Sequence, residues 1–380
     1  MKIAIIAGTF FPLSGGVQVE IHNMANKLVQ KGHSVDVYVY KNVDLKNNLY
    51  KIVPINYIFL SLLYILKRFF NFKLEKIFNI FNFRFIKLNY EIYHFHFLNF
   101  KSLILIEFLN YYKKKILVTF HGADIQIKKE INYGFRINKE FNFYLNKLLK
   151  NISGIQCISS NIYKDLIKLG INKKIIYKIP NSIYLNKKNY KKNDNDHFHL
   201  ITVGRFAKKK KGFDLIPKIA KKLIEKKIKF KWEIIGKNSQ KIYEDKFLLE
   251  NKDKIISIEN IENKKEFFFP ASKLLKHYYK ANLYINLARI ESFGLTYIEC
   301  LSCNTPILSF YSKGIDEILE NKKNGLFAKN IDDLVNKIYY LNSNRRYLKK
   351  ISNNCRKTIY KYNIDKNYLK LINFYKKFLN

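Results

Sequence analysis

Two glutamates eight positions apart, Glu291 and Glu299, stand at the ends of the stretch ESFGLTYIE. The apolar run ANLYINLA before it is typical of a buried strand, and the residues from Leu295 onward are typical of a helix. Ionised carboxylates accept hydrogen bonds from hydroxyl groups, so this pair could hold two hydroxyl-bearing parts of one ligand. The same spacing also suits a helix cap followed by a surface ion pair.

The turn between the glutamates should present main-chain amides. Phe293, Gly294 and Leu295 fall where the predicted helix starts, and the first amides of a helix have no acceptor within it. Such a helix start binds anions. The stretch therefore predicts a ligand that carries both phosphate and hydroxyl groups.

A basic pair follows another predicted strand, HLITVGRF. Gly204 and Arg205 end this run, and Lys211 comes six residues later. A guanidinium offers two parallel donors and an ammonium a compact charge, which together suit a diphosphate. The lysines at 208–210 are better interpreted as a solvated face, so we expect only Lys211 to bind.

The amino-terminal half offers two weaker candidates. Gly15 and Gly16 lie between the first predicted strand and a helix, where they permit close approach of a phosphate or simply form a turn. His121 and Asp124 follow the strand pattern KKILV in the stretch TFHGAD. A histidine at a strand end suits a cleft, and Asp124 could pair with it, cap a helix or accept an acceptor hydroxyl.

The elements around these residues alternate along the whole chain. Short β-rich runs such as KIAIIAG, HSVDVYVY, ISGIQCISS, KWEIIGK and TPILSF are separated by longer amphipathic ones, a pattern that predicts parallel sheets with helices on both faces. Ligands of such sheets bind beyond the carboxyl ends of the strands, where all of these candidates fall.

The length of 380 residues favours two domains. We predict an amino-terminal Rossmann-like domain at 1–182 and a polar linker at 183–198, which contains the tract LNKKNYKKNDNDHFH. A second Rossmann-like domain is predicted at 199–365 and a terminal helix at 366–380.

The composition limits the partners. Lys and Arg outnumber Asp and Glu by 70 to 30, a net charge of +40, but the excess is spread along the chain and no nucleic-acid-binding motif accompanies it. We therefore expect no nucleic-acid partner. The four cysteines form no disulfide or zinc pattern, which favours a reducing, cytoplasmic location.

Together these motifs resemble the retaining glycosyltransferases of family 4, which have the GT-B fold of two Rossmann-like domains facing across a cleft. The resemblance covers nearly the whole chain, from FFPLSGGVQVEIHNMANKLVQKGHSVDVY through TFHGADI, IPNS, VGRFAKKKKGFDLI and EIIGK to ESFGLTYIECLSCNTPILSFYSKGIDEIL. Glu291 and Glu299 match the E-x7-E motif of that family.

The resemblance implies transfer of a hexose-type sugar from a nucleotide-sugar donor, with retention and without a metal or other cofactor. Glu291 would contact hydroxyls of the donor sugar and Glu299 the ribose. Arg205 and Lys211 would neutralise the departing diphosphate, Gly16 would approach the phosphates and His121 would line the sugar pocket.

Three positions bear on how far the resemblance extends. Tyr184 stands where the family often has an aspartate, and Lys237 where it has a small or acidic residue, so recognition of the base stays open. The only Asp-x-Asp, at 194–196, falls in the predicted linker and reads as a solvated loop rather than a metal site.

The segment 57–88 mixes basic residues with Phe, Ile and Leu. It resembles a basic amphipathic surface for an anionic membrane, although buried helices with a basic rim fit it equally. The apolar run at 55–66 is too short to span a bilayer, which needs about 20 residues. We expect a cytoplasmic protein, peripheral on the inner face of the membrane if this segment docks there, acting on a saccharide or lipid-linked acceptor in cell-surface polysaccharide or lipopolysaccharide synthesis.

Two rival functions stay open. A nucleotide-sugar epimerase of the same fold would turn over the donor without an acceptor. A non-catalytic basic binding protein would show salt-sensitive binding to nucleic acid and no donor affinity. A glycosidase also uses two carboxylates, but it has no need of the basic partners of a diphosphate.

Overall fold

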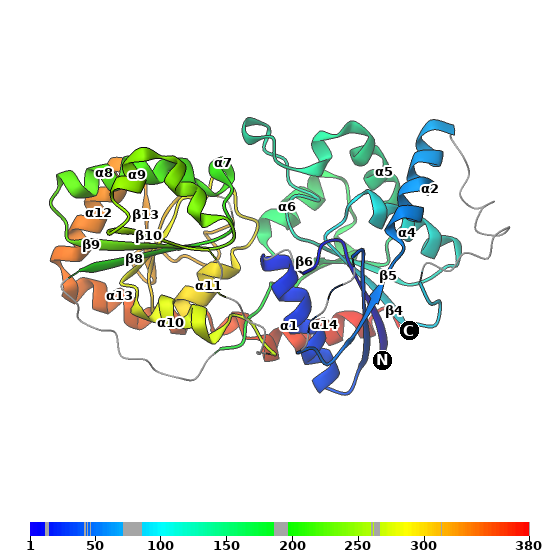
Figure 1. Ribbon diagram of the computed structural model, residues 1–380. Helices are drawn as coiled ribbons and strands as arrows, with labels where there is room; N and C mark the ends of the chain where they lie inside the picture. Colours follow the sequence, from blue (N-terminus) through cyan, green and yellow to red (C-terminus); the bar gives the residue numbers. More distant parts are fainter. Residues whose placement is uncertain are drawn as a thin grey trace. The chain divides into compact units, whose positions relative to one another are not determined.

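The computed structural model describes residues 1–11, 15–41, 43, 45, 47–70, 86–185, 197–259, 261, 267–312 and 314–379. Contacts divide the chain into a first unit, Met1–Asn181 with Asp365–Asn380, and a second unit, Ser182–Ile364. Each unit contains one parallel sheet covered by helices on both faces (Figure 1).

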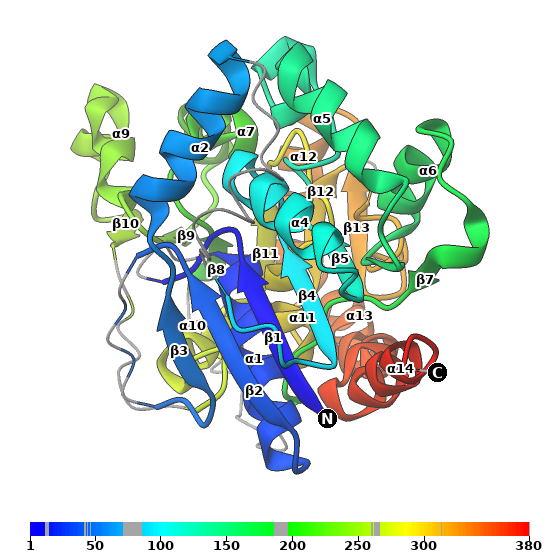
Figure 2. The same cartoon turned by 90° about the vertical axis from the view of Figure 1, so that its right-hand side faces the viewer.

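The sheet of the first unit has seven strands in the order β3-β2-β1-β4-β5-β6-β7, of which Figure 2 shows the first five side by side. All of its strand pairs are parallel. The strands are β1 (Lys2–Ala7), β2 (Ser34–Val39), β3 (Lys51–Pro54), β4 (Ile92–His96), β5 (Ile116–Phe120), β6 (Gly154–Cys157) and β7 (Ile176–Lys178).

The helices of the first unit form two layers. One layer contains α1 (Gly16–Gln30) and α14 (Ile364–Lys376), and the other contains α2 (Tyr57–Phe70), α4 (Phe100–Tyr111), α5 (Lys139–Leu149) and α6 (Ser160–Lys168). Single 3-10 turns, η1 (Lys129–Ile131), η2 (Phe135–Ile137) and η3 (Lys173–Ile175), occur in the connections.

The second unit repeats the architecture with six parallel strands in the order β10-β9-β8-β11-β12-β13. The strands are β8 (Phe198–Val203), β9 (Phe230–Ile235), β10 (Ile255–Ile258), β11 (Leu283–Asn286), β12 (Ile307–Phe310) and β13 (Gly325–Ala328). A buried apolar cluster between the sheet and its helices, centred on Trp232, forms the core of the unit.

Helices cover both faces of this second sheet. In Figure 1, α8 (Ile216–Glu225) and α12 (Ile331–Ser343) lie on one face, and α10 (Ser272–Lys280), α11 (Leu295–Ser302) and α13 (Arg345–Thr358) on the other. The shorter elements are α7 (Lys208–Lys211), η4 (Phe213–Leu215), η5 (Ser239–Glu244), α9 (Lys246–Glu250) and η6 (Tyr360–Tyr362).

The unit boundaries differ in detail from the predicted domain limits. Within the predicted linker 183–198, Ile183 pairs with Asn363 and so belongs to the second unit, residues 186–196 lie outside the described part, and β8 starts at Phe198. The predicted terminal helix starts at Ile364 and belongs to the first unit, not to a segment of its own. The helix belongs to the first unit because its buried aromatic side chains pack against that unit.

Side chains of α14 make specific bonds within the first unit. Asp365 forms an ion pair with Lys27 of α1, and the hydroxyl of Tyr375 lies 2.7 Å from Nδ1 of the buried His94 on β4. These contacts explain why the chain returns to its first sheet after completing the second unit.

The segment 57–88 is described only in part. Its first half is α2, 71–85 lie outside the described residues, and so do the side chains at 67–70. No helix in the described ranges combines the length and the apolar character that crossing a membrane requires.

Candidate functional site

The strand order of the second unit reverses between β8 and β11, because the chain moves outward in opposite directions from these two neighbours. Ligands of open α/β sheets bind beyond the carboxyl ends of the strands at such a point. Gly204 and Arg205 follow β8, and Glu291 lies in the loop after β11. The two strongest sequence motifs therefore meet at the expected ligand-binding edge.

Lys211 and Glu291 contact each other directly at this edge. The Nζ atom of Lys211 lies 2.7 Å from Oε2 of Glu291, and the two side chains are 22% and 15% exposed. Burial alone would raise the pKa of Glu291, but the charges of Lys211 and Lys210 and the Ser292 amide outweigh it and hold the pKa below its ordinary value. The site thus contains an ionised carboxylate and a fixed ammonium group.

Gly212 allows this contact. Its φ is +70°, and a Cβ atom there would lie 2.1 Å from the carbonyl oxygen of Leu287. Only glycine accepts both the left-handed backbone and this close approach. The loop after β8 can therefore lie against the loop after β11, which brings Lys211 to Glu291.

A second pair of side chains ties the same two loops together. Arg289 donates from Nη1 and Nη2 to the two oxygens of Asp214, each at 2.7 Å. Nη1 also donates to the Lys209 carbonyl at 2.6 Å, and the Arg289 amide donates to the Lys210 carbonyl at 3.0 Å. Bidentate pairing of this kind fixes geometry as well as charge.

Arg205 and Gly204 complete the β8 side of the site. The Gly204 amide donates to the Ile235 carbonyl in the neighbouring strand at 2.8 Å. A Cβ atom at position 204 would lie 3.8 Å from the Cε atom of Lys211, which is ordinary van der Waals contact. The Arg205 side chain is exposed. Arg205 is thus accessible to an anion.

The helix α11 starts at the same edge. Gly294 precedes it with φ of +91° and ψ of +67°, and the ring of Tyr297 occupies the place where a Cβ of Gly294 would be. Phe293, Gly294 and Leu295 are buried around this helix start. Their position gives the first turn of α11 the amide orientation that binds anions.

Glu299 lies further along α11 and is 5% exposed. Its Oε2 accepts a hydrogen bond from the Tyr278 hydroxyl at 2.9 Å. Burial raises its pKa to about 7, although the bond from Tyr278 works in the opposite direction. The interpretation of Glu299 as a surface ion-pair residue is therefore wrong.

The candidates of the first unit lie at the corresponding edge of their own sheet. Gly15 and Gly16 are exposed at the start of α1, which follows β1, and Gly15 has an extended backbone. His121 follows β5. Strand β4 separates β1 from β5 and adjoins both, so the two positions share one sheet edge.

His121 is buried and pairs with a second histidine. Its Nε2 lies 3.0 Å from Nδ1 of His96 at the end of β4, and the two rings stack with centroids 5.3 Å apart. Burial lowers the pKa of His121 to about 3. His121 is thus a neutral hydrogen-bonding group.

Asp124 builds the loop that carries His121. Its carboxylate accepts hydrogen bonds from the main-chain amides of Gly122 at 2.8 Å, His121 at 3.0 Å and Leu98 at 3.1 Å. No bond joins it to the His121 ring in the described structure. The structure thus shows neither the predicted pairing of Asp124 with the imidazole nor a helix cap, because the three amides belong to loop residues outside the helices.

Several residues of the site have no clear signal in the sequence. Arg289 and Asp214 are ordinary charged residues in a chain rich in them, and Tyr278 comes from α10, far from the motifs. His96 was detectable, because EIYHFHF places His94 and His96 on one face of a strand. Within the described residues, no group of three His, Cys, Asp or Glu side chains is arranged to hold a metal ion, and 194–196 lie outside them.

Comparison with known proteins gives two family matches. Residues 14–187 match the family model described as Glycosyltransferase Family 4, and 185–358 match the model described as Glycosyl transferases group 1. The two matched ranges overlap at residues 185–187 and together include every candidate residue.

Individual relatives are distant. The chain is 28% identical over 258 residues to alpha-monoglucosyldiacylglycerol synthase from Acholeplasma laidlawii, an alignment that covers 62% of each protein. It is 24% identical over 371 residues to an uncharacterised glycosyltransferase from Methanocaldococcus jannaschii, with 93% of this chain and 92% of that one covered.

Solved structures share the fold. HepE from Anabaena in complex with UDP and glucose superimposes with a TM-score of 0.75 at 12% identity, and the match covers 99% of this chain and 100% of that one. The two family models and the two Rossmann-like units lead to one assignment: the chain belongs to the group 1 glycosyltransferases of family 4 and has their GT-B fold.

Proposed function

We propose that this glycosyltransferase moves a hexose-type sugar from a nucleotide-diphosphate donor to a hydroxyl group of its acceptor, with retention at the anomeric carbon and without a metal ion. The observation that carries the proposal is the 2.7 Å pairing of Lys211 with Glu291 at the carboxyl ends of β8 and β11. In this proposal the ammonium group of Lys211 would supply a fixed positive charge, and the carboxylate of Glu291 would accept hydrogen bonds from hydroxyls, beside the first amides of α11.

The chemistry needs these groups. The bond between the anomeric carbon and the diphosphate oxygen breaks, and the electron pair leaves with the diphosphate. The acceptor oxygen bonds to the same carbon and gives its proton to the departing diphosphate. Lys211, the exposed Arg205 and the first amides of α11 would stabilise the charge that grows on the diphosphate.

The carboxylates would hold the rest of the donor. Glu291 would accept hydrogen bonds from sugar hydroxyls. The ammonium group of Lys211, which pairs with Glu291, would contact the diphosphate. Glu299 would bind the ribose, and its bond from Tyr278 fixes the orientation of the carboxyl group. In the first unit, His121 would line the sugar pocket, and Gly15 and Gly16 would approach the phosphates.

The acceptor would be a saccharide or a lipid-linked saccharide of a cell-surface glycan, of which lipopolysaccharide is one example. The similarity to a synthase that glucosylates a diacylglycerol lipid supports a glycolipid. Nucleotide sugars are made in the cytoplasm, so we place the reaction at the inner face of the membrane.

One surface of α2 fits such a location. Ile58, Leu62 and Ile65 are spaced by four and three residues and are 68%, 47% and 46% exposed, whereas Leu60 and Leu63 are buried. The helix thus carries an outward apolar stripe, and the sequence places Lys67 and Arg68 at its end. Apolar and basic residues combined in this way bind anionic bilayers.

The donor is tested by calorimetry of the purified chain with UDP-, GDP- and ADP-sugars. One donor class should bind the wild type, and Lys211→Ala and Glu299→Ala should each weaken it at least tenfold. Lys246→Ala, at a side chain 89% exposed, is the control. Failure of every donor to bind folded protein would contradict the proposal, and turnover of donor without any acceptor would favour an epimerase.

Retention is tested separately once an acceptor is found. The anomeric proton of the product, followed by NMR from the first turnover, should show the configuration of the donor. An inverted product would refute this part of the proposal.

A further inference from the structure

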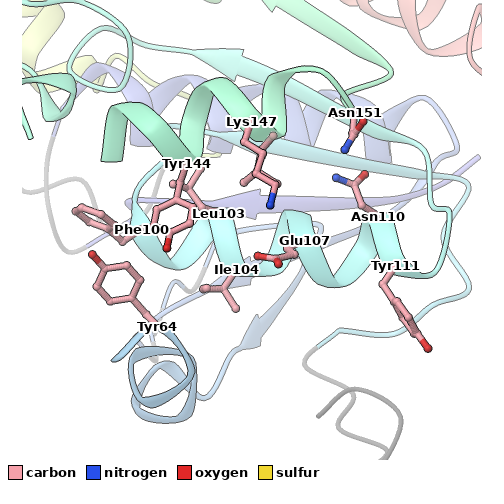
Figure 3. Close-up of a pocket in the computed structure, with 11 residues that line it drawn as sticks. Tyr64, Phe100, Leu103, Ile104, Glu107, Asn110, Tyr111, Tyr144, Lys147 and Asn151 are labelled. Carbon is pink, nitrogen blue, oxygen red and sulfur yellow. The ribbon is translucent and has the colours of Figure 1, made fainter. Parts of the chain in front are cut away.

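The first unit contains a cavity of about 270 Å³ that is distinct from the candidate site. It lies between α4 and α5, and α2 closes one side (Figure 3). All of its lining residues are among those described, and none has been assigned a role above.

One end of the cavity is aromatic and apolar. Tyr64, Phe100 and Tyr144 gather there, and the rings of Tyr64 and Phe100 have centroids 4.8 Å apart. Ile104 and Leu103 form the floor beside them. This end offers flat apolar surfaces to a ring-shaped ligand.

The other end is polar. Glu107 and Lys147 extend into the middle of the cavity, and Asn110 and Asn151 lie beyond them (Figure 3). Carboxylate, ammonium and amide groups supply acceptors and donors at short intervals along one wall. The cavity therefore has distinct hydrogen-bonding and stacking halves.

Asn110 contributes a side-chain amide to the polar end of the cavity. Its Nδ2 atom is less than 1 Å² exposed and has no hydrogen-bond partner among the described residues. Leaving a buried donor unpaired costs about 1–3 kcal/mol. Rotation of this amide toward a ligand acceptor in the cavity would remove that cost.

The lining discriminates among ligand classes. A bare acyl chain would remove water from the charged groups of Glu107 and Lys147 without replacing the hydrogen bonds that this water makes, which is unfavourable. A phosphate would meet the carboxylate of Glu107. A neutral pyranose ring has one face of C–H groups for the aromatic end and an edge of hydroxyls that donate and accept.

We infer that this cavity is a second, non-catalytic saccharide site that binds a neutral pyranose unit. It does not include the donor-binding residues of the second unit. That its natural occupant is a sugar of the acceptor, away from the hydroxyl that reacts, rests on the proposed function.

Helix α4 connects the cavity to the sheet edge of the first unit that carries His121. Asn99 caps this helix and donates to the Gly8 carbonyl at the end of β1 at 2.8 Å, and the Leu98 amide binds Asp124. Phe100, at the aromatic end, thus starts at the sheet edge that carries His121. A glycan chain could extend from that edge along α4.

The test is saturation-transfer NMR on the purified chain with methyl α-D-glucopyranoside, methyl α-D-galactopyranoside and methyl α-D-mannopyranoside, and with decanoate and inorganic phosphate as the competing classes. At least one glycoside should receive saturation from the wild type. Asn110→Leu and Tyr144→Ala, which change opposite ends of the cavity, should each reduce the transfer at least fivefold.

The matched control is Phe143→Ala, which removes a neighbouring ring on α5 that is 66% exposed and does not line the cavity. It should bind as the wild type does. Asn110→Asp, which keeps the shape of the side chain but removes its donor, should bind less than the wild type while melting at a similar temperature.

The inference is overturned if no glycoside receives saturation, if the cavity variants bind as the wild type does, or if decanoate or phosphate displaces the glycoside. Donor binding measured on the same samples separates the two proposals. Glycoside binding without donor binding would refute the proposed function alone, and the reverse would refute the saccharide site alone.

Discussion

Lys211 is held in place by neighbouring protein groups. Glu291 binds its ammonium group, and the Arg289–Asp214 pair anchors the loops on either side. A positive charge positioned in advance stabilises a developing negative charge without the cost of reorganisation. In the proposed function, Lys211 would therefore stabilise the diphosphate as it departs.

Replacing Lys211 by methionine should have two effects. The rate kcat/KM should fall by about 10²–10³-fold, as for loss of one fixed electrostatic group. The acid limb of the pH profile of kcat/KM should also shift to higher pH. Without the charge of Lys211, less positive charge opposes the effect of burial, which raises the pKa of Glu291. A profile measured from pH 5 to 9 reports both.

The control for this variant is Lys246→Met, at an exposed surface position. An unchanged acid limb in Lys211→Met would show that Glu291 is not the group that titrates. An unchanged rate would remove Lys211 from the site.

Glu299 should make stability depend on pH. Burial raises its pKa from 4.5 to about 7 in the folded chain, so the unfolded chain loses this proton first as the pH rises. The stability contributed by Glu299 is full below pH 4.5 and is lost as the pH rises through 7. The Glu299→Gln variant has no carboxyl group to titrate at this position. Between pH 4.5 and pH 7, its free energy of unfolding should therefore rise relative to that of the wild type by on the order of 3 kcal/mol.

Urea unfolding of both proteins at pH 4.5, 6 and 8 measures the difference directly. Taking the difference cancels the titration of Asp124, whose pKa burial also raises to about 7, and of the buried histidines. A difference that stays constant with pH would contradict the assignment of the titration to Glu299.

At the scale of elements, the loop between β8 and α8 is defined by one backbone position. Gly212 has a positive φ and lies against the Leu287 carbonyl. Gly170 has a similar φ of +75° but open space around it. The two glycines separate the cost of the backbone conformation from the cost of the close approach.

Gly212→Ala should lower kcat/KM at least tenfold and the free energy of unfolding by more than about 2 kcal/mol, because the added methyl group collides with the neighbouring loop and left-handed backbone is itself unfavourable. Gly170→Ala should cost only about 1–2 kcal/mol and leave the rate unchanged. Kinetics and chemical denaturation of both variants check this. Equal behaviour of the two would show that the loop approach is not required.

The apolar stripe of α2 gives a second prediction for an element. A triple variant with serine at Ile58, Leu62 and Ile65 should bind vesicles that contain phosphatidylglycerol at least fivefold more weakly than the wild type at moderate salt. Co-sedimentation measures the binding. Leu249→Ser, at an exposed position of the second unit, is the control. If the triple variant binds the vesicles as tightly as the wild type does, α2 is excluded as the docking surface.

The elements themselves could largely be predicted from the sequence, because strand-like runs and helical periodicity alternate clearly. The meeting of Lys211 with Glu291 could also be anticipated, since both follow strands of one parallel sheet. The partners Asp214, Arg289 and Tyr278 could not, because they depend on which loop touches which. That information lies in the positive φ of Gly212 and in the strand order, neither of which a local pattern reveals.

At the scale of the whole molecule, the first unit is assembled from both ends of the described chain. Within it, the Thr119 hydroxyl donates to Gln156, so His94 must donate to Thr119 from Nε2 and accept from Tyr375 at Nδ1. This directional network links β6, β5 and β4 to α14. The helix is therefore an integral part of the first unit.

Tyr375→Phe should destabilise the first unit by about 1–3 kcal/mol, since His94 then keeps a buried acceptor without a donor. Differential scanning calorimetry should show a lower transition temperature for the first unit and an unchanged one for the second. Tyr360→Phe, at a side chain 56% exposed in the second unit, is the control. A matching shift in both transitions would show that the two units unfold together.

The return of α14 has a consequence for biosynthesis. As the ribosome delivers the chain from the amino end, residues 182–364 are complete before α14 emerges, although the strands of the first sheet were made earlier. Domains generally fold as units during synthesis, so the second unit can reach its native state while the first still lacks a helix. The nascent first unit must keep the surface that α14 will cover accessible until α14 itself has been translated.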